Sequence, residues 1–242
     1  MTPGLDEYFD DPEADDELDD EADLPASLGE ADVARLPLVA IYADESCLGN
    51  GREGDNPGAA AGVIEHLNPA TERLTRWDYW IAERATTNNR MALRSAIEAF
   101  RVIGRKGGRF RVLFTSDSQY LVKGMTEWVH GWMSRGWRRK VGEIENLALW
   151  KELVVAASPH AVQWQWVKGH AGHPQNEYAN DLAVAAARGQ TTSAGARTSE
   201  FDGWLAAQRT RRRGMVDPAP FPVGRPFTPA RPYPRGRSAP RS

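Results

Sequence analysis

Residues 38–46 read Leu-Val-Ala-Ile-Tyr-Ala-Asp-Glu-Ser, a short apolar run that ends in two adjacent acids. The apolar part has the length of a buried strand, and Asp44 closes it. Two further strand-like runs follow at 58–66 and 73–82, separated by an Asn-Pro turn signal. Three consecutive strands joined by turns indicate an antiparallel meander.

After this meander the apolar period lengthens to that of a helix. Leu93, Ala96, Ile97 and Phe100 have the spacing of one helical face, so we expect an amphipathic helix that begins near Asn89 and ends at the following glycines. Residues 110–115 then form another short apolar run, which is typical of a buried strand.

The rest of the core is predicted from the same two periods. Residues 119–157 are expected to hold two or three helices, broken by glycines at 131, 136 and 142. Residues 162–166 alternate with period two and form the last strand, and 176–188 form the last core helix. This order predicts an α/β fold with a five-stranded mixed sheet, three antiparallel strands followed by parallel ones, flanked by helices.

Charge divides the chain into three parts. Residues 1–34 contain fourteen acidic and no basic residues, so this tail is expected to be disordered. Residues 191–242 contain ten arginines, three acidic residues and eight of the sixteen prolines, and we expect an extended, unfolded chain beyond Gly214. A short helix is expected at 199–213, with Phe201, Trp204 and Leu205 on one face. Residues 35–190 remain as the folded domain.

Composition narrows the class of protein. Hydrophobic residues make up 41% and charged residues 26%, near the average for globular domains. No apolar run approaches the roughly 20 residues that span a bilayer, and the N-terminal region is acidic where a signal peptide is basic. Cys47 is the single cysteine, which excludes an internal disulfide. We expect a cytoplasmic monomer with no membrane partner.

Two acids stand at strand ends. Asp44 closes the first predicted strand and Asp117 closes the fourth, in Thr115-Ser116-Asp117-Ser118. Carboxylates at the ends of neighbouring strands can converge on one divalent cation, because hard cations such as Mg2+ prefer oxygen ligands. The alternative is that each acid is a turn or N-cap residue, since Asp-Ser pairs are common at such positions.

Several motifs point to a known family. Over roughly 38–188 the chain resembles type 1 ribonuclease H, in the order and spacing of five segments. In chain order these are Asp44-x-Ser46-Cys47-Leu48-Gly49-Asn50, Thr86–Met91, Thr115–Tyr120, the Trp/Arg-rich 128–137, and Trp166–Pro174 with its Gly-His-Ala-Gly-His core.

The resemblance implies a ribonuclease H-like fold and an endoribonuclease that hydrolyses the RNA strand of RNA–DNA hybrids. It also implies two Mg2+ ions held by four carboxylates. Asp44 and Asp117 match two of these four. The other two are replaced, because the family's glutamate is Ala92 here and its aspartate is Asn180.

The replacements predict a weaker metal site, loaded with Mg2+ or Mn2+. Asn180 keeps a carbonyl oxygen and is a candidate weak ligand, while Ala92 keeps no ligand atom. Glu45, where the family usually has glycine, is our candidate for restoring the missing charge; the alternative is a solvated loop residue. Asp181 diverges from Asn180 by about 100° on a helix and is no free replacement.

The remaining candidates contact the substrate. His170 matches the family's loop histidine, which is thought to assist proton transfer or product release, although a lone loop histidine can be a plain surface residue. Neutral and basic side chains match positions that bind the hybrid's backbone and grooves. They are Asn50, Thr87, Asn88, Asn89, Gln119, Arg135, Arg138, Arg139 and Lys140.

Alternatives remain for several of these features. Asn88 and Asn89 fit a helix cap, and the neighbouring tryptophans fit packing of the helical hairpin better than binding. The competing function is a hybrid- or duplex-RNA-binding module whose catalysis has decayed. The tails are expected to modulate binding, with the arginines contacting phosphates and the acids competing for the same basic surface, unless both tails merely solubilise the protein.

Overall fold

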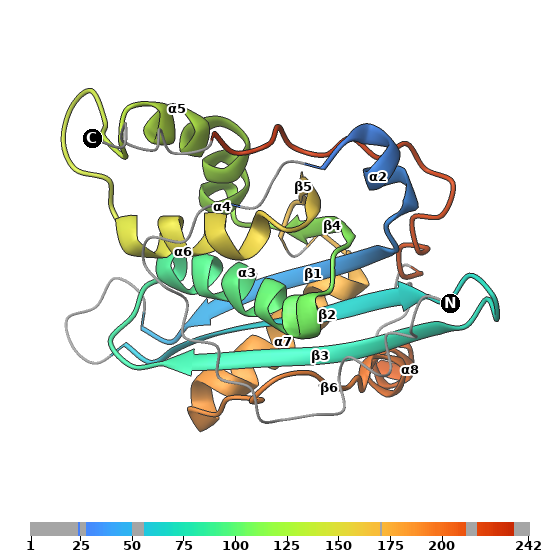
Figure 1. Ribbon diagram of the computed structural model, residues 1–242. Helices are drawn as coiled ribbons and strands as arrows, with labels where there is room; N and C mark the ends of the chain where they lie inside the picture. The colour runs from blue at the N-terminus through green and yellow to red at the C-terminus, as the bar shows by residue number, and fades with distance from the viewer. Residues whose placement is uncertain (1–23, 25–27, 50–55, 170, 212–216, 235–242) are drawn as a thin grey trace.

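The computed structural model describes residues 24, 28–49, 56–169, 171–211 and 217–234. Within these residues six strands form one sheet in the order β5-β4-β1-β2-β3-β6 (Figure 1). The first three strands make the predicted antiparallel meander, and the next two run parallel to the first. Their bounds are β1 (Leu38–Cys47), β2 (Gly58–Leu67), β3 (Leu74–Glu83), β4 (Arg111–Ser116) and β5 (Ala161–Trp166). The expected α/β fold with a mixed sheet is confirmed.

One strand of this sheet was absent from the prediction. β6 (Arg197–Thr198) pairs antiparallel with β3 through Trp77 and Asp78, so the sheet has six strands where five were expected. A two-residue strand is too short to show a period-two pattern. It also lies in the segment that composition assigned to the C-terminal tail.

The register of the central strands positions the acids. β1 pairs in parallel with β4, with Ala43 opposite Ser116. Asp44 and Asp117 each follow these paired residues by one position. The two carboxylates therefore lie side by side on adjacent parallel strands. β1 continues to Cys47, so the prediction that Asp44 closes this strand is wrong, whereas Asp117 does directly follow the end of β4.

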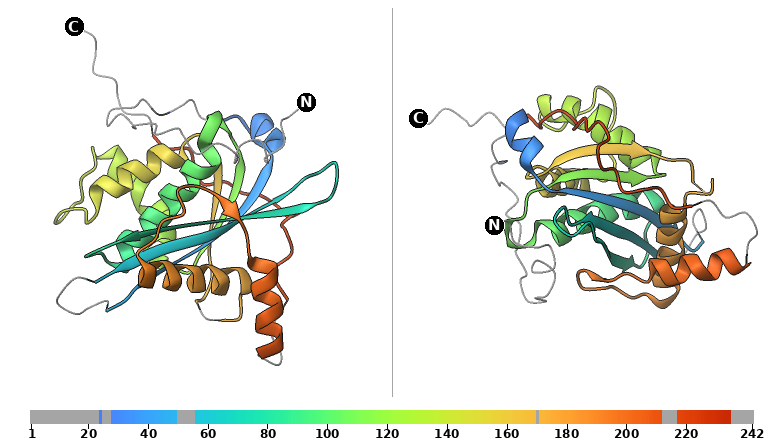
Figure 2. Two further views of the ribbon diagram at one scale, coloured as in Figure 1. Left: turned by 90° about the horizontal axis from the view of Figure 1, so that it is seen from below. Right: turned by 90° about the vertical axis from the view of Figure 1, so that its right-hand side faces the viewer.

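Helices cover both faces of the sheet. α3 (Asn88–Gly104) and α6 (Leu147–Ala157) pack against each other over one face, and α7 (Pro174–Gly189) covers β1 and β2 on the other (Figures 1 and 2). The predicted apolar stripe of α3 is buried, from Leu93 to Phe100. The side chain of Thr87 caps this helix by accepting a hydrogen bond from the Arg90 N–H.

The helical region 119–157 differs in one detail from the prediction. α4 (Gln119–Lys123), a π-helical turn at Gly124–Trp128 and α5 (Val129–Ser134) follow one another without interruption. Gly131 lies inside α5 and does not end it. Gly136 and Gly142 have φ values of 64° and 73° and lie in the connection to α6, where a positive φ favours glycine.

The tails contain more structure than composition suggested. The helix α2 (Glu30–Arg35) begins inside the segment 1–34 that was expected to be disordered, and residues 1–23 lie outside the described part. α8 (Phe201–Arg211) matches the helix expected at 199–213. Phe201, Trp204 and Leu205 pack in one cluster with Tyr178, as predicted.

The segment 217–234 is extended, as its prolines predict, but it is packed on the domain where an unfolded chain was expected. The Ala230 N–H donates a hydrogen bond of 2.7 Å to the Val162 carbonyl on the outer strand β5. Phe221, Ala230 and Tyr233 contact the hydrophobic clusters, so these few apolar residues suffice to hold the segment. No helix of the described chain has the length and apolar character to cross a membrane.

A buried histidine of the core, His160, links stability to pH. His160 is 7% exposed and stacks on Phe100 and Phe110, and neither ring nitrogen has a hydrogen-bond partner among the described residues. Burial, with a smaller contribution from Arg109, lowers the pKa of His160 to about 4. The neutral ring is therefore the form that the folded state favours.

We predict that acid weakens the fold partly through His160. Its stabilising contribution is complete above the unfolded pKa near 6.5 and is lost as pH falls toward 4, a loss of roughly 3 kcal/mol. The unfolding free energy of His160→Leu, measured by urea titration at several pH values, should fall less between pH 6.5 and 4 than that of the parent. Parallel pH profiles for the two proteins would contradict this assignment.

Candidate active site

Three carboxylates meet where β4 ends beside β1. One oxygen each from Asp44, Glu45 and Asp117 lies within 4.8 Å of the other two. Asp44 is buried, at 6% exposed, while the other two side chains are partly exposed. A hard divalent cation takes oxygen ligands of this kind, so the three side chains fit a metal site. The alternative that Asp44 and Asp117 are only turn or N-cap residues is less consistent with this convergence.

Burial and mutual repulsion raise the pKa of two of these acids. Burial, and next the negative charge of Asp117, raises the pKa of Asp44 to about 8. Burial and the charges of Asp44 and Asp117 raise the pKa of Glu45 well above its ordinary value. A divalent cation would offset both the desolvation and the repulsion, because it interacts favourably with all three ionised groups.

Asn176 holds Asp44 and was given no role by the sequence reasoning. It is 1% exposed, and its side-chain N–H group donates to Asp44 Oδ2 at 3.2 Å and to the Ala43 carbonyl at 3.4 Å. The Glu45 N–H donates to the other oxygen, Asp44 Oδ1, at 2.7 Å. The orientation of Asp44 is thus fixed from both sides. The sequence feature that could have pointed to Asn176 is its spacing from Asn180, because residues four apart lie on one face of a helix.

Asp117 is contacted by the last residue of β5 and by the loop that follows this strand. The Trp166 indole N–H donates to the Asp117 carbonyl at 3.0 Å. Gly169 lies so close to Asp117 that a Cβ at Gly169 would clash with Asp117 Oδ2 and would lie 3.2 Å from Asp117 Cγ. The absence of a side chain at position 169 is therefore what allows the loop to approach this acid.

Ala92 and Asn180, the two positions where the resemblance led us to expect carboxylates, lie on separate helices. Ala92, in α3, is 1% exposed and belongs to the main hydrophobic core. Asn180 lies one turn after Asn176 in α7, and its side chain donates to Asp181 at 3.5 Å. Asp181 accepts a hydrogen bond of 2.9 Å from the Trp204 indole of α8, so it points to that helix. This agrees with the expectation that Asp181 does not replace the lost aspartate.

The predicted histidine and one predicted asparagine cannot be placed. His170 and Asn50 lie outside the described residues, as does the loop 51–55. His173 is the N-cap residue of α7, and its ring lies 5.3 Å from that of Tyr42. Burial lowers the pKa of His173, which favours the neutral form of its ring.

The candidate backbone-binding residues lie at the starts of two helices. Thr87 caps α3, and Asn88 and Asn89 lie in its first turn. Gln119 begins α4 two residues after Asp117. Thr87 and Gln119 are exposed, while Asn88 and Asn89 are partly exposed. Asn88 Oδ1 is buried without a hydrogen-bond partner among the described residues. The helix-cap alternative for Asn88 and Asn89 is wrong, because the N-cap residue is Thr87 and the two asparagines are the first residues of the helix.

The basic ridge follows α5. Arg135, Arg138, Arg139 and Lys140 are all exposed, whereas Trp132 is 9% exposed and packs on Trp150. Trp128 and Trp137 pack against the main core as well. The structure thus agrees with the prediction that the tryptophans build the hairpin and the cations face solvent.

Comparisons with known proteins identify the family. The family described as RNase H matches residues 37–188. Ribonuclease H of Chromohalobacter salexigens is 41% identical over 152 residues, covering 62% of this chain and 85% of the relative, and that of Pelobacter propionicus is 42% identical over 146 residues, covering 60% and 82%.

A solved structure extends the match. It is described as LC9-RNase H1, a type 1 RNase H with the type 2 active-site motif. Its sequence is 55% identical, the alignment covers 86% of this chain and 98% of that chain, and the TM-score is 0.74. The chain belongs to the ribonuclease H family, in its type 1 branch. It is therefore a ribonuclease H enzyme with the predicted ribonuclease H-like fold, and its substrates are RNA–DNA hybrids.

We predict that Gly169→Ala impairs the site. The added methyl group must displace Asp117 or the loop, so metal-dependent activity should fall roughly tenfold or more. Gly203→Ala is the matched control, because a Cβ there meets no atom within 4 Å. Steady-state cleavage kinetics of both variants check this. Equal activity of Gly169→Ala and the control would show that the close approach has no catalytic consequence.

Proposed function

We propose that this ribonuclease H hydrolyses the RNA strand with divalent metal held by Asp44, Glu45 and Asp117, and with Asn180 as a weak fourth ligand. The observation that carries the proposal is the convergence of the three carboxylates within 4.8 Å. When bound, Mg2+ or Mn2+ would activate water and stabilise charge on the scissile phosphate.

The role of Glu45 follows from charge. Two of the family's four carboxylates are replaced by Ala92 and Asn180, which would leave two negative charges for the metal. Glu45 brings the count to three and stands next to Asp44. The description of LC9-RNase H1 as carrying a different active-site motif is consistent with such a departure within the type 1 branch.

Other side chains of this chain would bind and orient the hybrid. Thr87, Asn88, Asn89 and Gln119 supply neutral polar groups near the acids, suited to sugar and phosphate contacts in a shallow minor groove. Asn50 belongs to the same set by resemblance. Arg135, Arg138, Arg139 and Lys140 offer positive charge to the DNA strand. His170 would assist proton transfer or product release.

The tails and the oligomeric state remain proposals. We propose that the C-terminal arginines strengthen binding by neutralising phosphates and that the acidic segment 1–34 weakens it, with the domain acting as a monomer. Because 217–234 packs on the domain, its truncation would remove contacts as well as charges. Substitution of individual arginines therefore separates the two effects better than deletion.

The competing candidate is a binding module without catalysis. A module that only binds the hybrid has no need of three acids in one site, since their mutual repulsion is unfavourable without a cation. The acid cluster therefore favours the enzyme.

We predict cleavage of the RNA strand of a hybrid, no cleavage of duplex DNA, and a strict requirement for divalent metal. Mn2+ should serve at least as well as Mg2+, because it binds N/O ligands more tightly and demands ideal octahedral geometry less strictly. A labelled-substrate assay in each metal, with Asp117→Asn as the inactive control, checks this. Hybrid binding without metal-dependent cleavage would favour the binding module.

We also predict that Glu45 and position 92 act on one site. Glu45→Gln should remove most activity in the natural protein and should matter much less when Ala92→Glu is present. The effect of Ala92→Glu alone should be a gain in activity or metal affinity, larger together with Asn180→Asp. Kinetics of the double-mutant cycle measure the coupling, and strictly additive effects would refute it.

A further inference from the structure

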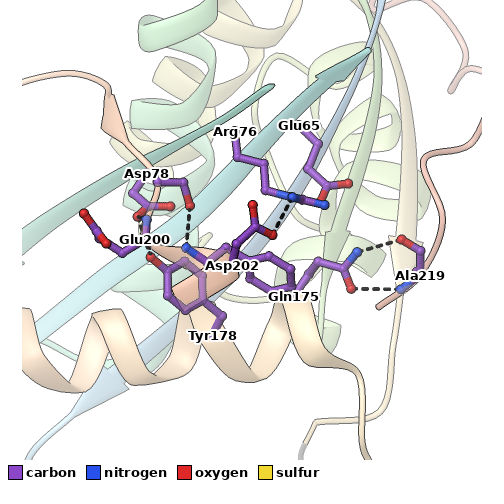
Figure 3. Close-up of polar contacts among 10 residues, drawn as sticks. Glu65, Arg76, Asp78, Gln175, Tyr178, Glu200, Asp202 and Ala219 are labelled. Atoms are coloured by element: carbon purple, nitrogen blue, oxygen red, sulfur yellow. Dashed lines mark hydrogen bonds and ion pairs between the residues drawn. The ribbon is translucent and has the colours of Figure 1, made fainter. Parts of the chain in front are cut away.

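A C-terminal extension, defined as residues 191–234, lies beyond the family match at 37–188 and packs on the helix that carries Asn176 and Asn180. It supplies β6 to the sheet edge, α8 to the face covered by α7, and then the extended segment 217–234 (Figure 2). Two polar anchors join this extension to α7, and both are drawn in Figure 3.

The first anchor is centred on Tyr178 of α7. Its hydroxyl donates to Asp78 Oδ2 of β3 at 2.5 Å and accepts a hydrogen bond of 3.1 Å from the Glu200 N–H of the extension. The same Glu200 N–H lies 3.2 Å from Asp78 Oδ2. Around this triad the Tyr178 ring packs on Phe201 and Trp204 of α8. Sheet, helix and extension thus share one buried contact.

The second anchor is Gln175, in the first turn of α7. Its side chain is fully buried, donates to the Ala219 carbonyl at 2.8 Å and accepts from the Ala219 N–H at 3.1 Å. This pair of bonds satisfies both ends of the amide with the backbone of the extension. Beneath it lies Glu65, also fully buried, which pairs with Arg76 at 2.7 Å.

The anchors lie directly behind the active site. Asn176, which holds Asp44, is the residue after Gln175, and Asn180 follows Tyr178 by two positions. An amide as buried as that of Gln175 is destabilising if it loses its hydrogen-bond partners, so the first turn of α7 depends on Ala219 being in place. A shift of that turn would move the Asn176 hydrogen bond to Asp44.

The extension also contacts the protein far from α7. The Thr228 N–H donates to Gln163 Oε1 of β5 at 2.8 Å, and His130 of α5 lies 2.9 Å from the Arg231 carbonyl. These contacts cover the outer edge of β5 and involve no residue of the acid cluster. Substitution of Gln163 can therefore serve as a control, because it removes a contact of the same extension at a place away from the acid cluster.

We propose that Gln175 is a positioning residue for catalysis: through Ala219, the C-terminal extension fixes the first turn of α7 and so the hydrogen bond from Asn176 to Asp44. The proposal rests on the metal-dependent function proposed above. It assigns the extension to the working structure of the nuclease, in addition to any effect of its positive charge.

The test compares Gln175→Leu with Gln163→Leu in the full chain. Each change removes an amide that bonds the extension, and each should lower the melting temperature by on the order of 3 °C. For Gln175→Leu alone we expect kcat to fall at least roughly tenfold with KM changed less than about twofold, because a misplaced group acts on the chemical step. Mn2+ affinity by titration calorimetry, without substrate, should fall roughly tenfold as well.

Tyr178→Phe is a second variant in case Gln175→Leu does not fold. It keeps the ring packing, removes the hydroxyl from the first anchor, and should lower kcat and Mn2+ affinity in the same direction. The proposal is overturned if kcat and Mn2+ affinity stay at the parent values, or if Gln163→Leu loses as much of both. If the parent protein cleaves no hybrid, the proposed function fails, and the calorimetric comparison still decides the role of Gln175.

Discussion

The parallel pairing of β1 with β4 is the constraint on which the rest of the structure depends. It places Asp44 and Asp117 one residue beyond paired positions, so two carboxylates meet at a buried edge and Glu45 joins them. Burial and mutual repulsion make this an unfavourable arrangement by itself, as the raised pKa values of Asp44 and Glu45 indicate. Close packing and hydrogen bonds must therefore hold it in place.

Two elements supply that support, each through a different kind of contact. α7 orients Asp44 by a side-chain hydrogen bond from Asn176, and the loop after β5 approaches Asp117 at a glycine. α3 contributes only the buried Ala92 at this level, and that residue belongs to the hydrophobic core and brings no charge to the site. The site is thus built on two strands and one helix, with Glu45 beside Asp44.

The extension adds a third layer to this arrangement. The match to the family model ends at residue 188, yet α7 is bonded on its far side to Glu200 and Ala219. Buried polar groups that bond across two segments make the position of each segment depend on the other. The region that composition presents as a basic tail is in this protein a packing partner of the helix behind the active site.

The sequence by itself determined the strand order, the amphipathic α3, the acids Asp44 and Asp117 and the family, because period, turn residues and ordered motifs are local features. It also singled out Glu45, although neighbouring residues on a strand usually point to opposite faces; the convergence of its carboxylate with those of Asp44 and Asp117 is visible only in the folded chain. Tertiary structure alone decided the sixth strand, the packing of 217–234 and the roles of Asn176 and Gln175. These depend on partners more than 40 residues away in the chain, which no local pattern reveals.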